Sequence, residues 1–230
     1  MAVHGGPDII TDGLVFAVDA ADKNSYPGSG TTWYDLSGNG NNGALSNSTI
    51  GTDTPGDMHF DGSTDYIQID KTDFQMGTTE EITAACWINF DASDIYKALI
   101  FNGGGGGSNG WGLMLNNNEA FRVEIMGADN VRNTFAPDFG YTTGTWFYLA
   151  AAFKRTKIIT YKNGVLNYTS GAFSDPGAIT NGSTHLYLGS YNTNDWFFDG
   201  KMRIVQIWGR ELTAAEILQN FNAHRSRFSV

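Results

Sequence analysis

Short apolar and alternating segments recur along the whole chain and predict β-strands. Alternation of apolar and polar residues is typical of a strand with one buried face, and a short continuous apolar run is typical of a strand buried on both faces. The predicted strands cover residues 14–18, 58–69 with a turn at 61–63, 82–90, 111–115, 120–126, 146–153, 157–162, 165–169, 185–188 and 202–208. Asn163-Gly164 predicts a tight hairpin between two of them, because a type I′ turn needs positive φ at both central residues.

One helix is predicted, at residues 213–223. Thr213 and Glu216 have the spacing of a capping box, in which each side chain satisfies a free amide at the start of the helix. Ala214, Ile217 and Phe221 then repeat at helical spacing. No linker or internal repeat divides the chain. The pattern therefore predicts one all-β domain over 1–230, either a sandwich or a jelly roll, with one short C-terminal helix.

Composition narrows the range of partners. The chain has 230 residues, with 24 acidic against 14 basic side chains and a net charge of −10. An acidic protein without a basic block is a poor candidate for binding nucleic acid or an anionic membrane. A single Cys excludes an internal disulfide framework and a cysteine-rich zinc site. The first residues do not show the basic and then apolar pattern of a secretion signal, so we expect no signal peptide.

Several segments together resemble a known family. Ser-Tyr-Pro-Gly-Ser-Gly-Thr-Thr-Trp stands at 25–33, and Trp-Gly-Arg-Glu-Leu-Thr-Ala-Ala-Glu-Ile at 208–217. Further matching segments lie at 13–20, 35–43, 60–67, 146–153 and 161–164. Over about 12–227, the chain resembles the laminin-G-like branch of the concanavalin A-like lectin/glucanase superfamily, especially its stand-alone domains in tailed-phage virions. The resemblance implies two large antiparallel sheets stacked as a jelly roll.

The phage resemblance also implies a role. We expect a non-enzymatic structural protein on the virion surface, either a capsid decoration or a tail-associated subunit, made in the host cytoplasm. Its expected partners are other capsid or tail proteins and further copies of itself. The alternative is a lectin-like module that recognises host-surface glycans, with or without Ca²⁺. A glycosidase with unusual catalytic acids is a weaker third hypothesis.

The distribution of glutamates disfavours catalysis. Glycosidases place two carboxylates on opposite sides of the scissile bond, and the glucanases that this chain resembles carry them as a Glu-x-Asp-x-(x)-Glu run on one strand. No Glu in the sequence belongs to such a run. Glu119 and Glu124 are five residues apart, so they face opposite sides of a strand. We therefore predict no enzymatic activity and no catalytic residues.

Calcium is the one cofactor that the resemblance suggests. Relatives often hold Ca²⁺ near the N-terminal Asp-x-Ser-Gly-Asn-Gly loop, and hard cations prefer carboxylate and carbonyl oxygens. The candidate ligands are Asp19, Asp35, Asn39, Asn41 and Asp61. Alternatively, Asn and Gly occur there because both tolerate turn geometry. Many calcium-binding relatives have acidic residues where this chain has Arg203 and Ile204, which argues against the site.

Two groups of residues are candidates for contact with other molecules. The first consists of aromatic, amide and carboxylate side chains in loop-like surroundings, suited to stacking on sugars or to anchoring a protein partner. Its members are Trp33, Tyr191, Asn194, Asp195 and Trp196. The second is the basic C-terminal cluster of Arg225, Arg227 and Phe228. This cluster is expected either to dock on an acidic neighbour or to complement the C-terminus of the helix.

Overall fold

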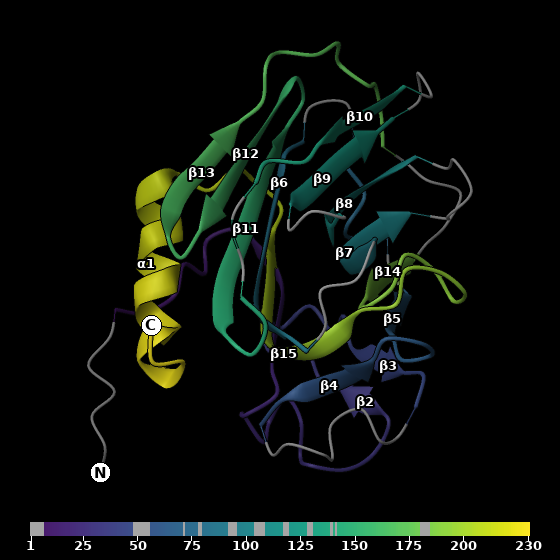
Figure 1. Cartoon of the computed structure of the whole chain (residues 1–230), viewed down its shortest axis with the longest axis vertical. Helices are drawn as coiled ribbons and strands as arrows, with labels where there is room; N and C mark the ends of the chain where they lie inside the picture. The colour runs from purple at the N-terminus through teal and green to yellow at the C-terminus, as the bar shows by residue number, and fades with distance from the viewer. Residues whose placement is uncertain are drawn as a thin grey trace.

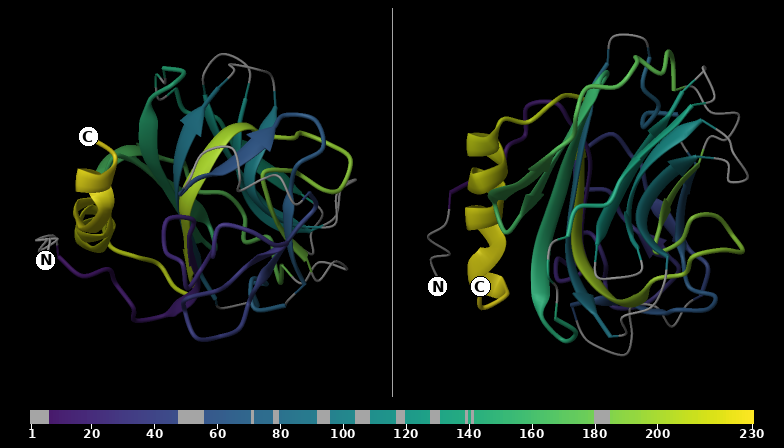
Figure 2. Two further views of the ribbon diagram at one scale, coloured as in Figure 1. Left: turned by 90° about the horizontal axis from the view of Figure 1, so that it is seen from below. Right: turned by 45° about the horizontal axis from the view of Figure 1, so that its top comes forward.

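Two antiparallel β-sheets lie face to face, and a single helix packs on the outside of one of them (Figures 1 and 2). The structure is a computed structural model. It describes residues 7–47, 56–70, 72–77, 80–91, 96–103, 109–116, 120–127, 131–138, 140, 142–179 and 185–230. In this part of the chain, no helix is long and apolar enough to cross a membrane. The predicted jelly-roll sandwich with one short C-terminal helix is confirmed.

The seven-stranded sheet packs against the helix. In spatial order its strands are β1 (Leu14–Asp19), β15 (Asp199–Trp208), β6 (Ile82–Phe90), β11 (Trp146–Lys154), β12 (Lys157–Lys162) and β13 (Val165–Thr169), with β4 (Met58–Asp61) also paired to β15. Every residue of β6 is buried, because its neighbours flank it in the sheet and both sheet faces are covered. Asn163 and Gly164 have φ of 50° and 76°, so the predicted hairpin between β12 and β13 is confirmed.

The eight-stranded sheet forms the other layer. In spatial order its strands are β10 (Arg132–Phe135), β9 (Phe121–Met126), β8 (Gly110–Leu115), β7 (Lys97–Gly103), β14 (His185–Leu188), β5 (Ile67–Asp70), β3 (Gly43–Leu45) and β2 (Thr32–Trp33). The sequence pattern missed β2, β3, β7 and β10, which are short, polar or run into glycines. The predicted segment 58–69 is two strands in different sheets, because the turn after Asp61 carries the chain from one layer to the other.

Apolar side chains from the facing sides of the two sheets make the main core. Trp111 of β8 and Phe153 of β11 meet there with ring centroids 5.2 Å apart, and the Trp111 indole donates to the Phe74 carbonyl at 2.8 Å. Burial of such large side chains supplies most of the stabilisation of a sandwich.

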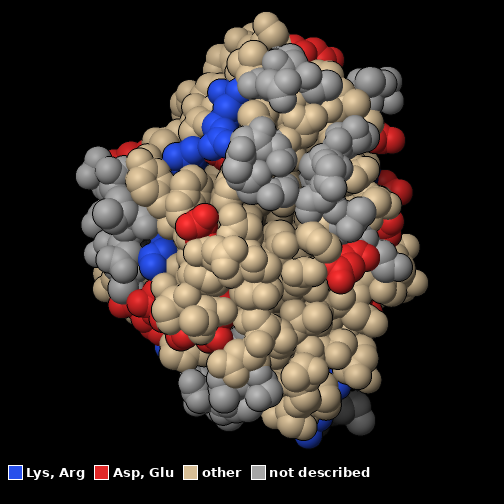
Figure 3. Space-filling view, turned by 90° about the vertical axis from the view of Figure 1, so that its right-hand side faces the viewer, with Lys and Arg blue, Asp and Glu red and all other residues tan. Residues whose placement is uncertain are grey.

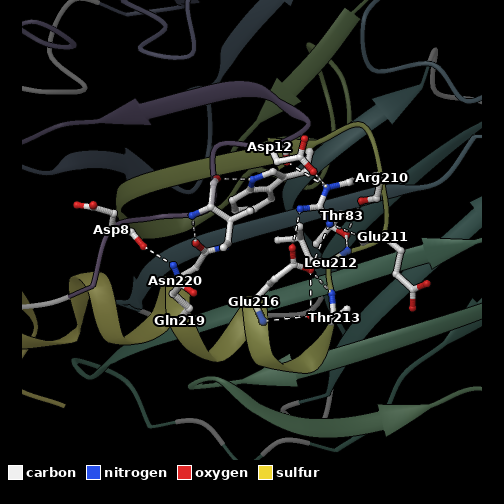
Figure 4. Close-up of polar contacts among 12 residues, drawn as sticks. Asp8, Asp12, Thr83, Arg210, Glu211, Leu212, Thr213, Glu216, Gln219 and Asn220 are labelled. Carbon is white, nitrogen blue, oxygen red and sulfur yellow. Dashed lines mark hydrogen bonds and ion pairs between the residues drawn. The ribbon is translucent and has the colours of Figure 1, made fainter.

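The predicted helix is α1 (Ala214–His224), and its capping box is present. The Thr213 hydroxyl accepts the Glu216 amide at 3.3 Å, and the Glu216 carboxylate accepts the Thr213 amide at 2.7 Å. Arg210 also donates to Glu216 at 2.6 Å (Figure 4). This ion pair, together with the capping hydrogen bonds, lowers the pKa of Glu216 to about 2.

The N-terminal segment lies alongside the helix. The Gln219 side chain donates to the Asp8 carbonyl at 2.8 Å, and Asn220 Oδ1 accepts the Ile10 amide at 2.8 Å (Figure 4). The Trp208 indole donates to the Ile10 carbonyl at 2.8 Å. Contacts between residues about 200 positions apart therefore join the two ends of the chain on this side of the sandwich.

Candidate functional site

The outer face of the eight-stranded sheet brings arginine, glutamate and aromatic side chains close together. Along β9, Arg122 and Glu124 alternate with Val123 and Ile125, which belong to the main core. Since neighbouring residues of a strand point to opposite faces, Arg122 and Glu124 lie on the outer face. Figure 3 views this side of the molecule, where uncharged residues predominate and Lys and Arg gather near the upper left.

Two arginines surround one carboxylate here. Arg122 donates to Glu124 at 2.8 Å, and Arg132 on β10 approaches the same carboxylate at 3.7 Å. Only 5% of the Glu124 side chain is exposed, and buried charges of this kind require partners. Among the described residues, the buried Arg122 Nε has no hydrogen-bond acceptor. The trio carries a net positive charge and retains unused donors.

An aromatic pair stands beside the arginine. The rings of Tyr96 and Trp196 stack with centroids 5.3 Å apart and planes 24° apart. The Arg122 guanidinium lies 5.6 Å from the Tyr96 ring and 5.4 Å from the Trp196 ring, within the range of a cation–π contact. Tyr96 and Trp196 both have positive φ, 49° and 57°. Bulky residues rarely adopt this conformation, and strain of this kind clusters at functional sites.

The loop 191–196 holds the pair in place. Its turn is closed by the Tyr191 amide on the Asp195 carbonyl at 3.0 Å and by the Asn194 amide on Asn192 Oδ1 at 2.7 Å. The Tyr191 ring packs on Phe101, with centroids 4.0 Å apart, and forms the floor beneath Trp196. Burial, followed by the nearby Glu124 charge, raises the pKa of Tyr191, so its hydroxyl stays protonated at neutral pH.

Phe101 determines the shape of this floor. A Cβ added at Gly112 would lie 2.5 Å from the Phe101 ring, and one added at Gly103 would be equally close. Glycine is therefore required at both positions for the ring to lie flat over the neighbouring strands.

Four predicted contact residues share this loop, and one does not. Trp196 packs on Tyr191, while Asn194 and Asp195 are exposed at the tip. Tyr191 itself is buried, so its prediction as an exposed contact residue is wrong. Trp33 was predicted at the surface, and that prediction is wrong. It is fully buried in the main core, because β2 joins the eight-stranded sheet and turns this side chain inward.

Two members of the C-terminal cluster, Arg227 and Phe228, bind their own chain, so the prediction that they dock on a neighbour is wrong, whereas docking by the exposed Arg225 stays a prediction. Phe228 is buried and stacks on Trp87 with centroids 3.9 Å apart and planes 4° apart. Arg227 forms two hydrogen bonds to the Asp19 carboxylate, at 2.6 and 2.8 Å. Arg225 is exposed, with its guanidinium 5.9 Å from the Phe221 ring.

The predicted calcium ligands serve three separate structural purposes. The Asp35 carboxylate accepts four hydrogen bonds, from the Ala17, Ser37 and Asn41 amides and from the Ser37 hydroxyl. These bonds tie the 35–43 loop to β1.

The Asn39 and Asn41 side chains donate to the Val15 carbonyl at 3.2 and 2.8 Å. Asp19 pairs with Arg227, and Asp61 closes its own turn through bonds from Ser63 and Thr64. Within the described ranges, no three His, Cys, Asp or Glu residues are placed to hold a metal ion. Turn geometry explains Gly38 and Gly40, which have positive φ, but not Asn39 and Asn41, whose side chains instead tie the loop to β1; calcium binding stays a prediction.

A hollow of about 520 Å³ lies elsewhere, between the 19–23 loop and the end of α1. Its described lining contains the Asp19–Arg227 ion pair and His224, but no Trp, Tyr or Phe. It lacks the aromatic side chains that commonly line small-molecule sites.

The sequence analysis missed Tyr96, Arg122 and Arg132. Alternation in the predicted strand 120–126 does place Arg122 and Glu124 on one face, and this signal was available. Tyr96 and Arg132 join them only because β7 and β10 flank β8 and β9 in the sheet.

A family model described as the concanavalin A-like lectin/glucanases superfamily matches residues 60–218, well over half of the chain. The chain belongs to this superfamily. The match includes the aromatic pair, both arginines and the 191–196 loop. A search of curated proteins gave no match.

Solved structures with the same fold include toxin and sialidase domains. The botulinum neurotoxin serotype D binding domain aligns with a TM-score of 0.68 and 17% identity, covering 92% of this chain and 52% of that one. The serotype D ligand-binding domain in complex with N-acetylneuraminic acid gives 0.67 and 17%, covering 92% and 51%. A Trypanosoma rangeli sialidase in complex with 2,3-difluorosialic acid gives 0.68 and 16%, covering 95% and 34%. The chain spans about half or less of these proteins, and at such identities the likeness shows the fold alone.

Proposed function

We propose that this protein is a non-catalytic carbohydrate-binding domain whose binding face is the outer surface of the eight-stranded sheet. One observation carries the proposal: Tyr96 and Trp196, both in strained backbone conformations, stack at the surface beside Arg122. Flat aromatic rings offer apolar area to the C–H faces of sugars, and neighbouring polar groups meet their hydroxyls.

The polar groups around the pair suit hydroxyl-rich ligands. Arg122 and Arg132 supply donors, whereas the exposed Asn194 and Asp195 supply acceptors at the loop tip. The loop is held by its own hydrogen bonds. Binding a ligand therefore costs little conformational entropy, because the loop is already ordered.

The superfamily and the sugar-bound relatives of the same fold support this proposal. They favour it over the virion structural role, for which the comparisons supply nothing. The virion location and partners stay predictions, and mass spectrometry of purified particles would test them. Absence of catalysis also stays a prediction, and incubating the protein with any glycan that it binds would detect hydrolysis.

Glycan-array binding tests the function. We expect the wild-type protein to bind a defined set of glycans and Trp196→Ala to lose about tenfold or more in affinity, because the stacking platform is removed. Tyr34→Ala is the matched control, since Tyr34 is also exposed but lies beyond β2 at the far end of this sheet. Repeating the array with a chelator separates calcium-dependent from calcium-independent binding. Failure of the wild-type protein to bind any glycan at high concentration would refute the proposal.

A further inference from the structure

A second cluster of aromatic and polar side chains lies on the same face, on the far side of the 191–196 loop. The Tyr66 ring lies 6.1 Å from Tyr187 and 6.5 Å from Phe197, and His185 lies 5.8 Å from Tyr187. Phe197 directly follows Trp196 in the chain, so the two aromatic clusters adjoin. Together, Tyr96, Trp196, Phe197 and Tyr66 form what we call the aromatic track, and the buried Tyr187 packs against it.

Strand register places both clusters on one face. Gln68 pairs with Tyr187, Tyr187 with Phe101, Phe101 with Gly112, and Gly112 with Glu124. Residues directly opposite one another across strands share a face. Strands β5 and β9 are four steps apart in the sheet, which is about 19 Å at the usual strand spacing. The surface from Glu124 to Gln68, with the aromatic track along part of it, therefore crosses the strands for the length of several linked sugars.

The two ends of the track differ in charge. At the β9–β10 end, which we call the arginine end, two cations share the single Glu124 carboxylate. Arg132 is loosely held there: its contacts to Glu124 and to the Tyr191 hydroxyl are 3.7 and 3.4 Å long. The Arg132 side chain is about one-third exposed, so its remaining donors can reach a ligand carboxylate.

The other end, which we call the polar end, carries an exposed acid. Gln68 donates to Asp70 at 2.7 Å, and His185 Nδ1 lies 2.5 Å from the same carboxylate. Two-thirds of the Asp70 side chain is exposed. Such a group accepts hydrogen bonds from sugar hydroxyls and repels an anionic sugar.

We infer that the aromatic track binds a linear oligosaccharide laid across the strands, with a carboxylate-bearing sugar at the arginine end and a neutral sugar at the polar end. The inference rests on the proposed carbohydrate-binding function and adds to it a ligand class and a direction. The difference in charge between the two ends determines which way the oligosaccharide lies. Because the track is long, affinity should increase with the number of sugars in the oligosaccharide.

Titration calorimetry on the full chain tests both parts. The probes are oligosaccharides from disaccharides to hexasaccharides, in matched pairs that differ only in whether a terminal sugar is neutral or a sialic or uronic acid. Wild-type protein should prefer the acidic member about tenfold, the worth of one charge-assisted contact. Its affinity should also rise along each series.

Two substitutions separate the ends. Arg132→Gln should abolish the preference for acidic members and weaken binding of neutral ones much less, since the amide still donates to a hydroxyl, whereas Arg225→Gln, an arginine on the helix side, should change neither affinity. Tyr66→Ala should remove the gain with chain length and leave the shortest probes unaffected, with Tyr34→Ala as its control. If Tyr66→Ala does not fold, Gln68→Ala, a smaller change at the same end, replaces it in this test.

The possible failures are distinct. Equal affinity for acidic and neutral members overturns the assignment of the arginine end. The extended track is overturned if Tyr66→Ala and Gln68→Ala weaken the binding of short and long probes equally. It is also overturned if neither variant loses affinity for any probe. Wild-type protein that binds no member of the panel and no glycan on the array overturns the proposed function itself.

Discussion

The outer faces of the two sheets differ: one is covered by a large apolar cluster, and the other carries a small one. Each sheet buries one face against the other, which leaves a second face to be covered or solvated. On the seven-stranded sheet, α1 and the C-terminal segment cover that face with an apolar cluster that includes Trp87, Phe221 and Phe228. On the eight-stranded sheet, the corresponding apolar cluster is small, and arginine, glutamate and partly exposed aromatic rings surround it.

This contrast separates aromatic residues that stabilise from those available for binding. Trp87 is fully buried, with Phe228 stacked in parallel on its ring, and it has no route to a ligand. Trp196 is only partly buried, and its ring lies between Tyr96 and Tyr191. Backbone strain also falls on the open side, at Tyr96 and Trp196. A strained, partly exposed aromatic residue adds less to stability than a buried one does. Such a residue is therefore a candidate for a role in function.

The largest expected effect comes from removing the buried indole. Trp87→Ala should lower the free energy of unfolding by about 4 kcal/mol, because it leaves a cavity beneath Phe228 and Phe221. Urea denaturation followed by circular dichroism measures the loss. The matched substitution on the open face, Trp196→Ala, should cost about 1 kcal/mol or less while it weakens glycan binding. Similar costs for the two variants would contradict the division between a covered and an open face.

A smaller effect is expected from pH on the covered side. Burial, followed by the positive charge of Arg227, lowers the pKa of His224 to about 4, although the Asp19 carboxylate opposes the shift. The unfolded chain therefore binds a proton at His224 more readily than the folded chain does. Its contribution to stability is complete above about pH 6.5 and is lost as the pH falls towards 4.

From the fall in pKa from 6.5 to about 4, we expect the loss to be about 3 kcal/mol. Urea titrations of the wild-type protein and of His224→Gln across this range measure it, with glycan binding followed in parallel. The variant should show a flatter dependence between pH 6.5 and 4. A variant as pH-dependent as the wild-type protein would assign the effect to other groups.

The smallest expected effect concerns the helix cap. Thr213→Ala removes the hydroxyl that accepts the Glu216 amide and should cost about 1 kcal/mol. Thermal melts measure the change, and Thr213→Ser should restore most of the stability. Because α1 covers only the seven-stranded sheet, glycan affinity should be unchanged at temperatures where the variant is folded. A parallel loss of binding would show that the two faces are coupled.

Local patterns in the sequence were sufficient for the elements that depend on local physics. The hairpin at Asn163-Gly164 and the capping box at Thr213 and Glu216 were both predicted, because each is decided by residues a few positions apart. The central strands were predicted because β6 and β11 are apolar along nearly their whole length. Strands β2 and β10 were missed, because two or four residues with polar side chains give no periodic signal.

The same limit applied to the candidate site. Tyr191 and Trp196 were recognised because they lie in one short loop of aromatic and amide residues. Trp33 has a similar local composition, yet it points into the core, and nothing near it in the sequence distinguishes the two outcomes. Phe228 and Arg227 were likewise placed at a partner surface, although Trp87 and Asp19, more than one hundred residues away, hold them.

The residue pattern by itself determined an all-β sandwich or jelly roll, the helix and its cap, and the absence of a paired catalytic acid motif. These follow from periodicity, turn chemistry and the inventory of residue types, and the family resemblance narrowed the fold to the two-sheet jelly roll. Only the tertiary structure decided which face is open and which aromatic rings remain available for a ligand. Strand order brings Tyr96, Arg122, Arg132 and Trp196 together from four separate segments. That order depends on packing between residues far apart in the chain, so it cannot be predicted from local sequence patterns.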